Sequence, residues 1–362
     1  MKNFGFGCMR LPIKGGEVDI HQFSEMVDCF LAAGFTYFDT AHGYIQGKSE
    51  TALRECLVKR YPRDRYVLTD KLTVHFFNNR ADLPGLFADQ LEKTGVEYFD
   101  YYLMHALTSD FYRKFVRCGA FDFAKELKAQ GKIKHIGISF HDKAEVLEQI
   151  LSEHPEVEVV QIQFNYADYD DPTIQSRAVY DVCVRHNKPV IIMEPCKGGG
   201  LINLPEEAKK VLKTLGGSPA SYAIRYAASF PQVMMVLSGM STSEQLEENV
   251  GFMADFAPLT DTENHAIDQV RAILKSQDLI ACTACRYCTD GCPKKISIPD
   301  LFACYNDKKQ YKDWNSDFYY MVSTTGKGKA SDCIRCGKCE KECPQHLLIR
   351  DLLKDVAAAL ER

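Results

Sequence analysis

The sequence contains no apolar run long enough to cross a membrane. Its longest runs, such as 189–193, have the length of a strand, whereas a membrane span needs ~20 residues. It also lacks an excess of positive charge. Its 44 Lys and Arg against 49 Asp and Glu give a net charge of −5, which argues against a broad basic surface for nucleic acid or an anionic membrane. The first five residues show no leader-like apolar stretch, so we expect a cytoplasmic protein.

The composition is that of an ordinary globular protein. Of the 362 residues, 46% are hydrophobic and 26% are charged, which argues against a disordered chain or a coiled coil. At roughly 100–200 residues per domain, this length accommodates two or three domains, or one large barrel with a small partner.

Short apolar runs alternate with amphipathic stretches over most of the chain. We expect helices at 21–33, 49–59, 83–94, 111–130 and 262–276. The runs between them have the length of buried strands and lie at 4–7, 37–39, 66–71, 99–104, 136–139, 159–163, 190–193 and 233–237. Eight such units in ~250 residues predict an α/β fold with a parallel sheet closed as a (β/α)8 barrel. A doubly wound open sheet is the competing architecture, but no Gly-x-Gly-x-x-Gly follows any strand.

The character of the sequence changes after residue 276. From residue 280 onwards cysteine, lysine and short helical stretches dominate, with helices expected at 298–306 and 310–322. We therefore predict two domains, a barrel at 1–276 and a small, mainly helical domain with a C-terminal helix at 277–362. No low-complexity linker separates them.

Eight of the fifteen cysteines repeat the spacing C-x2-C-x2-C-x3-C-P twice. In this spacing three thiolates bind one [4Fe–4S] cluster, while the fourth, on the following helix, reaches the other cluster. The sequence thus predicts two clusters. Cluster one would bind Cys282, Cys285, Cys288 and Cys343, and cluster two would bind Cys333, Cys336, Cys339 and Cys292.

Zinc and a disulfide network are the alternatives for these cysteines. Zinc sites usually pair two C-x2-C units rather than a triplet with a distant fourth thiol, and disulfides are not expected without a secretory signal. The two motifs resemble the dicluster ferredoxin family. They begin 51 residues apart (333 − 282), closer to the helical dicluster modules of larger redox enzymes than to compact ferredoxins. Cys304 lies outside both motifs and is expected in the core.

Polar residues end several of the predicted strands. Asp39 and Tyr44 end or follow the second strand, Lys71 ends the third and His105 follows the fourth. In a (β/α)8 barrel these ends meet at the catalytic face. The aspartate can hold the lysine, and the lysine can lower the pKa of the phenol from ~10. The tyrosine can then protonate a carbonyl oxygen while a hydride reaches the carbon, and the histidine can hydrogen-bond the same oxygen.

The order of these motifs resembles the aldo-keto reductase family. The matching residues are Phe38-Asp39-Thr40-Ala41-x-x-Tyr44-x-x-Gly47-x-Ser49-Glu50, Lys71, His105, Gly137-Ile138-Ser139, Gln161-x-x-Phe164-Asn165 and Glu247-Glu248-Asn249. They follow the family's order over residues 4–255. The resemblance implies a TIM barrel, an NAD(P)H cofactor bound without a Rossmann motif, and a catalytic tetrad of Asp39, Tyr44, Lys71 and His105, with Tyr44 as the acid.

The resemblance also implies which residues contact the nucleotide. They are Gly7, Met9, Asp39, Ser139, Gln161, Asn165, Met193, Pro195, Gly239, Ser241, Gln245, Glu248 and Asn249. Of these, Ser139, Gln161 and Asn165 border the nicotinamide, whereas Glu248 and Asn249 hold the adenine end.

Several positions depart from the family pattern. Phe140 stands where many members have asparagine, and Met193 where many have an aromatic residue that stacks on the nicotinamide. Members that demand NADPH carry a lysine and an arginine where this chain has Gly239 and Gln245. Because a 2′-phosphate favours a cation, the choice between NADH and NADPH stays open.

The two predicted domains handle electrons differently. Hydride transfer moves two electrons together, whereas iron–sulfur clusters pass them singly, and a flavin is the usual adapter. No motif indicates a flavin, although barrels can bind a flavin phosphate, so a flavin stays open. We expect an oxidoreductase that reduces a carbonyl or oxidises an alcohol with NAD(P)H, and whose clusters exchange electrons with a redox partner protein or with the substrate. The alternatives are an electron-transfer or regulatory module that senses the nucleotide with little turnover, and clusters with a purely structural role.

Overall fold

The computed structural model describes residues 3–170, 174–276, 279–311 and 315–361. The chain forms two compact units. The first comprises Met1–Cys196 and Ala220–Glu263, and the second comprises Lys197–Pro219 and Asn264–Arg362. The boundary predicted between 276 and 277 falls at residues 277–278, which lie outside the described residues, and it stays a prediction.

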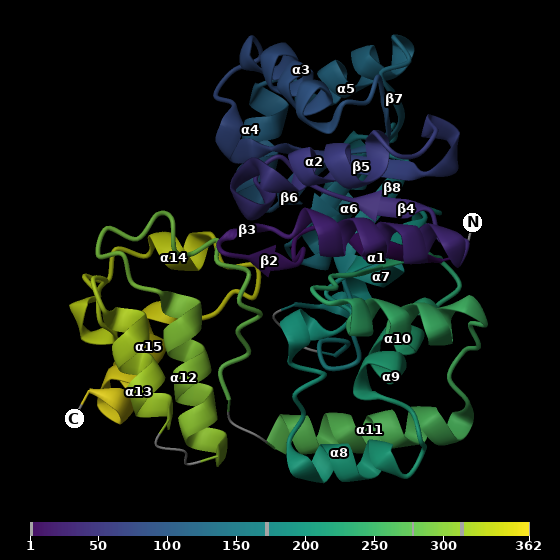
Figure 1. Cartoon of the computed structure of the whole chain (residues 1–362). Helices are drawn as coiled ribbons and strands as arrows, with labels where there is room; N and C mark the ends of the chain where they lie inside the picture. The colour runs from purple at the N-terminus through teal and green to yellow at the C-terminus, as the bar shows by residue number, and fades with distance from the viewer. Residues whose placement is uncertain (1–2, 171–173, 277–278, 312–314, 362) are drawn as a thin grey trace. The chain divides into compact units, whose positions relative to one another are not determined.

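Eight parallel strands of the first unit close into a barrel (Figure 1). In chain order they are β1 (Phe4–Gly7), β4 (Tyr37–Asp39), β5 (Val67–Thr73), β6 (Phe99–Leu107), β7 (Ile133–Phe140), β8 (Val159–Gln163), β9 (Val190–Met193) and β10 (Val233–Ser238). Strand β1 closes the barrel because it pairs in parallel with both β4 and β10. The predicted (β/α)8 architecture is confirmed, and the carboxyl ends of the strands meet at one face.

Helices connect the strands. In this unit they are α1 (Ile20–Ala32), α2 (Lys48–Leu53), α3 (Asp82–Thr94), α4 (Ser109–Arg117), α5 (Ala120–Ala129), α6 (Ala144–Glu153), α7 (Ser176–Arg185), α9 (Pro219–Ala228) and α10 (Ser243–Ala254). A short hairpin, β2 (Ile13–Lys14) and β3 (Glu17–Val18), precedes α1. The single helix predicted at 111–130 is wrong, because Gly119 takes a left-handed conformation (φ +66°) between α4 and α5. The helix predicted at 49–59 begins as α2 and continues as a π-helical turn, Arg54–Val58.

The interior of the barrel is filled by side chains. One buried apolar layer consists of Tyr37, Leu103, Val159, Ile191, Met235 and Leu237. Gly137 of β7 leaves room for this layer, because a Cβ at position 137 would lie 2.3 Å from Leu103 Cδ2 and 2.6 Å from Val159 Cγ1. A packed interior leaves the ends of the strands as the place where a ligand can bind.

The second unit is mainly helical. Its helices are α8 (Glu206–Lys213), most of α11 (Asp261–Ser276), α12 (Ile298–Tyr311), α13 (Asn315–Thr324), α14 (Lys338–Lys341) and α15 (Ile349–Leu360). Helix α12 packs against α13 and α15 around a core that includes Leu301, Phe302 and Cys304 (Figure 1). Cys304 is buried, as predicted. Residues 312–314 of the helix predicted at 310–322 lie outside the described residues.

Candidate active site and cluster cysteines

Four polar side chains lie together at the carboxyl ends of three neighbouring strands. Asp39 is the last residue of β4, Lys71 lies in β5, and His105 lies in β6 opposite Thr73. Tyr44 follows β4 in the loop that leads to α2. Lys71 is fully buried, Asp39 and His105 are nearly so, and Tyr44 is half-buried. The structure therefore brings the four residues of the expected tetrad to one place.

Lys71 is the centre of this group. Its Nζ donates to Asp39 Oδ1 (2.5 Å) and to the carbonyl oxygen of Thr40 (2.7 Å), and it lies 3.4 Å from Tyr44 Oη. A buried ammonium needs such partners, because an unpaired charge in the barrel would be strongly destabilising. Gln161 Nε2 donates to the second oxygen of Asp39 (3.0 Å). Gln161 therefore fixes the orientation of the carboxylate that holds Lys71.

The phenol of Tyr44 keeps its proton. Burial raises the pKa of Tyr44 well above its usual value of 10, and the carboxylates of Asp39 and Asp70 raise it further. The prediction that Lys71 lowers this pKa is therefore wrong. Asp39 already neutralises the ammonium at 2.5 Å, so burial and the surrounding carboxylates dominate. The raised pKa means that the phenol still carries its proton at neutral pH, as a general acid must, although it also makes the phenol a weaker acid.

His105 is held in its neutral form. Burial and the positive charge of Lys71 lower the pKa of His105 well below 6.5. Thr73 Oγ1 lies 2.8 Å from its Nδ1, and its ring packs edge-on to Tyr44 with 5.7 Å between centroids. When Thr73 donates to Nδ1, the neutral ring carries its proton on Nε2 and can donate it to a carbonyl oxygen. Sequence analysis missed Thr73, although the two-residue period of β5 places it on the same side as Lys71.

The residues expected at the nicotinamide differ in whether their polar groups already form hydrogen bonds within the protein. Ser139 is buried, and its Oγ has no hydrogen-bond partner among the described residues. Asn165 Nδ2 instead donates to Asp168 Oδ2 (2.8 Å) and to the carbonyl oxygen of Glu194 (3.0 Å), while its Oδ1 accepts from two backbone amides. Ser139 thus offers an unused hydroxyl that fits a carboxamide, whereas Asn165 can bind a ligand only in exchange for an existing bond.

The residues expected along the rest of the nucleotide lie near the ends of β1, β9 and β10. Gly7, Met9, Met193 and Ser241 are partly buried, Pro195 and Asn249 are buried, and Gly239, Gln245 and Glu248 are exposed. Asn249 Nδ2 donates to Ser238 Oγ (3.1 Å), and Gln245 Oε1 accepts from the amide of Ser241 (2.8 Å). These two side-chain amides therefore hold the loop between β10 and α10.

Arg10 is a cation beside this loop that sequence analysis missed. A Cβ at Gly239 would lie 3.4 Å from both Cβ and Cδ of Arg10, so the missing side chain at 239 makes room for the arginine. Ser241 Oγ donates to the carbonyl oxygen of Arg10 (2.9 Å) and joins the two loops. The two segments meet because β1 pairs with β10, Phe6 opposite Ser238. No sequence spacing relates residue 10 to residue 239.

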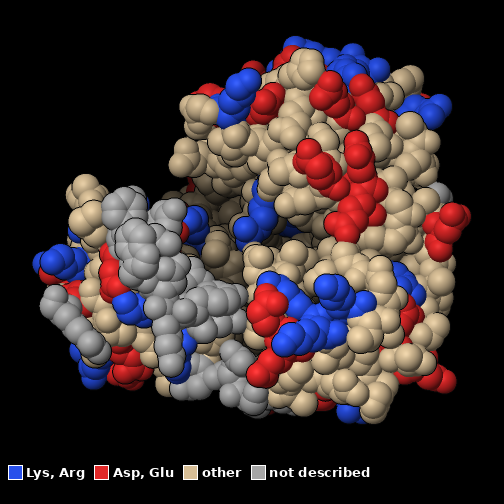
Figure 2. All heavy atoms as spheres, turned by 60° about the horizontal axis from the view of Figure 1, so that its bottom comes forward, with Lys and Arg blue, Asp and Glu red and all other residues tan. Residues whose placement is uncertain are grey.

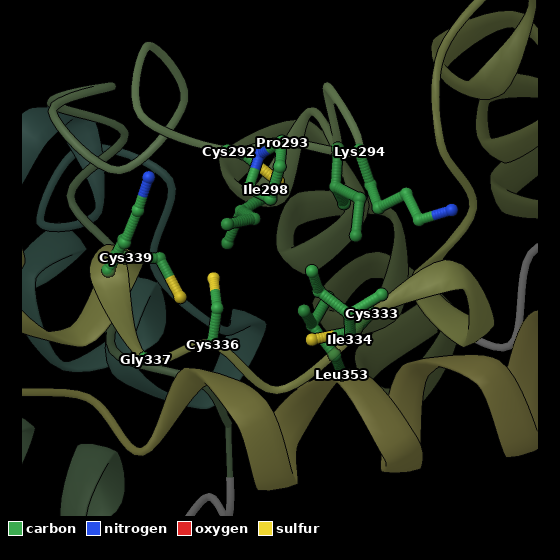
Figure 3. A pocket seen from close by; sticks show the side chains of 12 residues that line it. Cys292, Pro293, Lys294, Ile298, Cys333, Ile334, Cys336, Gly337, Cys339 and Leu353 are labelled. Carbon is green, nitrogen blue, oxygen red and sulfur yellow. The ribbon is translucent and has the colours of Figure 1, made fainter.

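Four cysteines of the second unit surround one cavity (Figure 3). Cys292, Cys333, Cys336 and Cys339 line an empty space of about 340 Å³ that opens to solvent. Apolar residues such as Ile298 and Leu353 line the same space, and Figure 3 shows the sulfur atoms of Cys336 and Cys339 pointing toward one another. These four cysteines come from both motifs and are the set that the spacing assigns to cluster two.

The other four motif cysteines also lie close together. Burial raises the pKa of Cys288, and the thiols of Cys285, Cys282 and Cys343 raise it further, so the four are within electrostatic range. Within the described ranges, no three His, Cys, Asp or Glu side chains converge closely enough to hold one metal ion. A zinc site needs its donors at ~2.0–2.3 Å from a single atom, whereas each thiolate of a cubane binds its own iron. The eight thiols, in two sets of four, match the number of ligands that two [4Fe–4S] clusters need.

Charges of both signs are distributed over the surface. On the face shown in Figure 2, acidic and basic side chains form separate small groups, in keeping with a net charge of −5. All fifteen cysteines have free thiols in this structure. In the part of the chain that the structure describes, no helix has both the length and the apolar surface that a membrane crossing requires.

Comparison with known proteins finds a matching family model for each of two segments of the chain. Residues 3–272 match the model of the aldo/keto reductase family. The chain belongs to the aldo/keto reductase family. Residues 281–348 match the model of the 4Fe-4S dicluster domain. This aldo/keto reductase is thus an oxidoreductase with a C-terminal domain that carries iron–sulfur clusters.

Solved structures show the same fold at low sequence identity. The aldo-keto reductase of Klebsiella pneumoniae in complex with NADPH is 20% identical, with a TM-score of 0.61 over 74% of this chain and 90% of that chain. An aldo-keto reductase of Bacillus halodurans in its holo form is 24% identical, with a TM-score of 0.62 over 74% and 91%. A curated relative, 4-dihydromethyl-trisporate dehydrogenase of Mucor mucedo, is 32% identical over 106 residues. That match spans only 30% of the relative and 28% of this chain.

Proposed function

We propose that this protein reduces a carbonyl compound with NAD(P)H, with oxidation of the alcohol as the reverse reaction, and that Tyr44 donates the proton. The observation that supports this most directly is the buried contact of Lys71 with Asp39 (2.5 Å) and Tyr44 (3.4 Å). A carbonyl oxygen bound beside Tyr44 Oη takes up the phenolic proton as the carbon gains a hydride. The Lys71 ammonium then stabilises the phenolate that remains.

His105 orients the substrate in this proposal. Its neutral imidazole, fixed through Thr73, presents an Nε2–H group beside Tyr44. Two donors on one carbonyl oxygen polarise the bond and align it for hydride transfer. Because the pKa of His105 is lowered well below 6.5, the imidazole keeps this role down to mildly acidic pH.

The nicotinamide cofactor supplies the hydride when bound. Ser139, Gln161 and Asn165 would hold the nicotinamide, with the unused Ser139 hydroxyl as the group that fits it best. Arg10 would hold the 2′-phosphate of NADPH in place of the cations missing at Gly239 and Gln245, since guanidinium groups pair well with phosphate. The NADPH bound to the Klebsiella enzyme supports the same choice of cofactor.

The second domain would add one-electron chemistry, which its clusters supply when bound. Cluster one would be held by Cys282, Cys285, Cys288 and Cys343, and cluster two by Cys333, Cys336, Cys339 and Cys292. Cys336 is exposed, so a redox partner protein can approach cluster two from solvent. We assign no described residue to a flavin. A cytoplasmic location is part of the proposal, since a reducing compartment keeps the motif cysteines available as cluster ligands.

A second candidate function is an electron-transfer or regulatory module that senses the nucleotide with little turnover. The observation that favours it lies at the nicotinamide end. The amide of Asn165 is fully used within the protein, and Met193 ends β9 where many family members have an aromatic ring. This alternative predicts nucleotide binding without turnover across a broad panel of aldehydes and ketones.

One anaerobic preparation tests both candidates. Iron, sulfide and flavin are assayed together with NADPH and NADH oxidation on the carbonyl panel, for the wild type and Tyr44→Phe. We expect about eight iron and eight sulfide per chain, and turnover that is lost in Tyr44→Phe while the nucleotide still binds. Nucleotide binding by the wild type without any turnover would support the sensing module. Zinc in place of iron would refute the cluster assignment.

A further inference from the structure

Two carboxyl groups meet at a site that solvent does not reach. Glu50 of α2 and Asp70 of β5 are both 0% exposed, and their side chains hydrogen-bond to each other. Asp70 Oδ1 accepts from the amide of Lys71 (2.7 Å), whereas Asp70 Oδ2 has no donor partner among the described residues. Two ionised carboxylates cannot hydrogen-bond to each other, so one of them carries a proton. We call Glu50 and Asp70 the carboxyl pair.

The groups around the carboxyl pair do not supply enough positive charge for two carboxylates. His42 Nδ1 lies 3.2 Å from both oxygens of Glu50 and its Nε2 lies 3.5 Å from Asp89 Oδ2, while burial lowers the pKa of His42. From α3, Gln90 hydrogen-bonds to Glu50, and Lys93 pairs with Asp89 (2.8 Å) at the protein surface. From the strands, Lys71 is paired with Asp39 and Tyr102 donates to Gln90. Burial accordingly raises the pKa of Glu50 to about 7 and that of Asp70 well above its usual value.

The carboxyl pair also anchors the loop that carries Tyr44. Residues 45–47 of this loop have φ angles of +52°, +58° and +83°. Non-glycine residues rarely adopt such angles, so surrounding contacts must impose them. One such contact is that of His42 with Glu50, and Glu50 is in turn bound to Asp70 of β5, next to Lys71. The carboxyl pair thus links α2, which follows the Tyr44 loop, to the residue of β5 next to Lys71.

We propose that the carboxyl pair is a pH-sensitive latch: one shared proton joins Glu50 to Asp70, and its loss at alkaline pH releases the Tyr44 loop from β5 and stops turnover. Glu50 and Asp70 are positioning residues, since they act on the reaction through the loop. The effect on turnover rests on the proposed function, whereas release of the loop is measurable without it. Tyr44 itself does not explain an alkaline loss of reduction just above neutral pH, because its own pKa lies well above 10.

The test compares the wild type with Asp70→Asn, whose amide donates to Glu50 at every pH. Between about pH 7 and pH 10, we expect the kcat of carbonyl reduction by the wild type to fall about tenfold per pH unit once the proton is lost. Backbone amides 41–49 should lose protection from hydrogen exchange over the same range, after correction for the intrinsic rate. Asp70→Asn should keep both kcat and protection. Glu55→Gln, which removes an exposed carboxyl paired with Lys59, is the matched control and should behave like the wild type.

Glu50→Gln provides a second version of the test if Asp70→Asn does not fold, because the new amide donates to Asp70. Protection of the wild-type loop that stays constant to about pH 10 would overturn the latch, as would a loss of protection that persists in both amide variants. A pH-dependent loop in a protein that turns over no carbonyl would refute the proposed function and leave the latch standing. Carbonyl turnover together with loop protection that does not change with pH would refute the latch and leave the proposed function standing.

Discussion

Lys71 and Asp39 form an ion pair inside the barrel, with 2.5 Å between Nζ and Oδ1 and side chains 0% and 4% exposed. Burying two charges gains little net stability, because the desolvation of both groups offsets their attraction. The pair is better explained by its position, since it places an ammonium 3.4 Å from Tyr44 Oη without leaving a net charge in the barrel. The stabilising effect of each residue is therefore expected to depend on the presence of the other.

Removing one member of this pair should be far more damaging than removing both. Asp39→Asn leaves the Lys71 ammonium buried without its counter-ion, and we expect the free energy of unfolding to fall by about 3–5 kcal/mol. The double variant Asp39→Asn with Lys71→Met should recover much of this loss. Anaerobic urea unfolding measures both. A single variant as stable as the wild type would contradict the burial argument.

Tyr44→Phe removes the proposed proton donor but keeps the ring beside His105. Because general acid catalysis contributes about 10²–10⁴-fold, we expect kcat to fall by that factor while the Kd for NADPH stays the same. Tyr61→Phe, which removes a phenol bonded to Asp28 on the outside of the barrel, is the control and should keep its kcat. Equal activity of Tyr44→Phe and the wild type would exclude Tyr44 as the acid.

The carboxyl pair also predicts how stability depends on pH. Burial raises the pKa of Glu50 from 4.5 to about 7 in the folded state. Its contribution to stability is therefore fully present below pH 4.5 and is lost as the pH rises to about 7. From this group alone, the free energy of unfolding should be about 3 kcal/mol smaller above pH 7 than at pH 4. Chemical denaturation of the wild type and Glu50→Gln at both pH values should show a larger loss in the wild type, because in the variant only the raised pKa of Asp70 remains.

Arg10→Ala tests the choice of cofactor. A charge-assisted hydrogen bond contributes about 1.5–3 kcal/mol, so we expect NADPH to bind roughly ten- to a hundredfold more weakly, while NADH binding is unchanged. Fluorescence titration with both nucleotides, and with 2′,5′-ADP against 5′-AMP, measures the difference. Lys14→Ala, an exposed cation in the neighbouring hairpin, is the control. An equal loss for NADH and NADPH would show that Arg10 does not contact the 2′-phosphate.

Cysteine variants test the assignment of cluster ligands. Cys336 lines the cavity with three other motif cysteines, whereas Cys304 is buried outside both motifs. We expect Cys336→Ser to lower the iron content from about eight towards about four per chain, because only cluster two loses a ligand. Cys304→Ser should keep about eight. Iron analysis with electron paramagnetic resonance of the reduced protein distinguishes the two variants, and an unchanged content in Cys336→Ser would refute the assignment.

The strands were largely predictable because a parallel strand buried on both faces is a short continuous apolar run. The bounds of β8 and β9 agree with the prediction to the residue. Strands β5 and β6 extend beyond their predicted C-terminal ends. Their last residues include polar ones, such as Thr73 and His105, which interrupt the apolar run by which a buried strand is predicted. The break at Gly119 was not predicted because apolar residues keep a helical spacing on both sides of it. The backbone nevertheless leaves the helical conformation at this glycine.

The candidate site was predictable where its residues belong to motifs in chain order. Its supporting contacts were not, because they join segments far apart in the sequence. Arg10 reaches Gly239 only because the barrel closes, and the contact between Glu50 and Asp70 depends on how α2 lies against β5. The raised pKa of Tyr44 was also missed, since it reflects burial and a surplus of carboxylates rather than one neighbouring lysine.

Strand β5 carries opposite charges on consecutive residues, Asp70 and Lys71, and both are fully buried. Consecutive residues of a strand point to opposite faces, so the ammonium lies inside the barrel and the carboxyl on the side of α2. A slip of β5 by one residue would exchange them, placing a carboxylate against Asp39 and removing the ammonium from Tyr44. The order of the two charges on β5 thus favours a single alignment of this strand, in addition to the burial of its leucines.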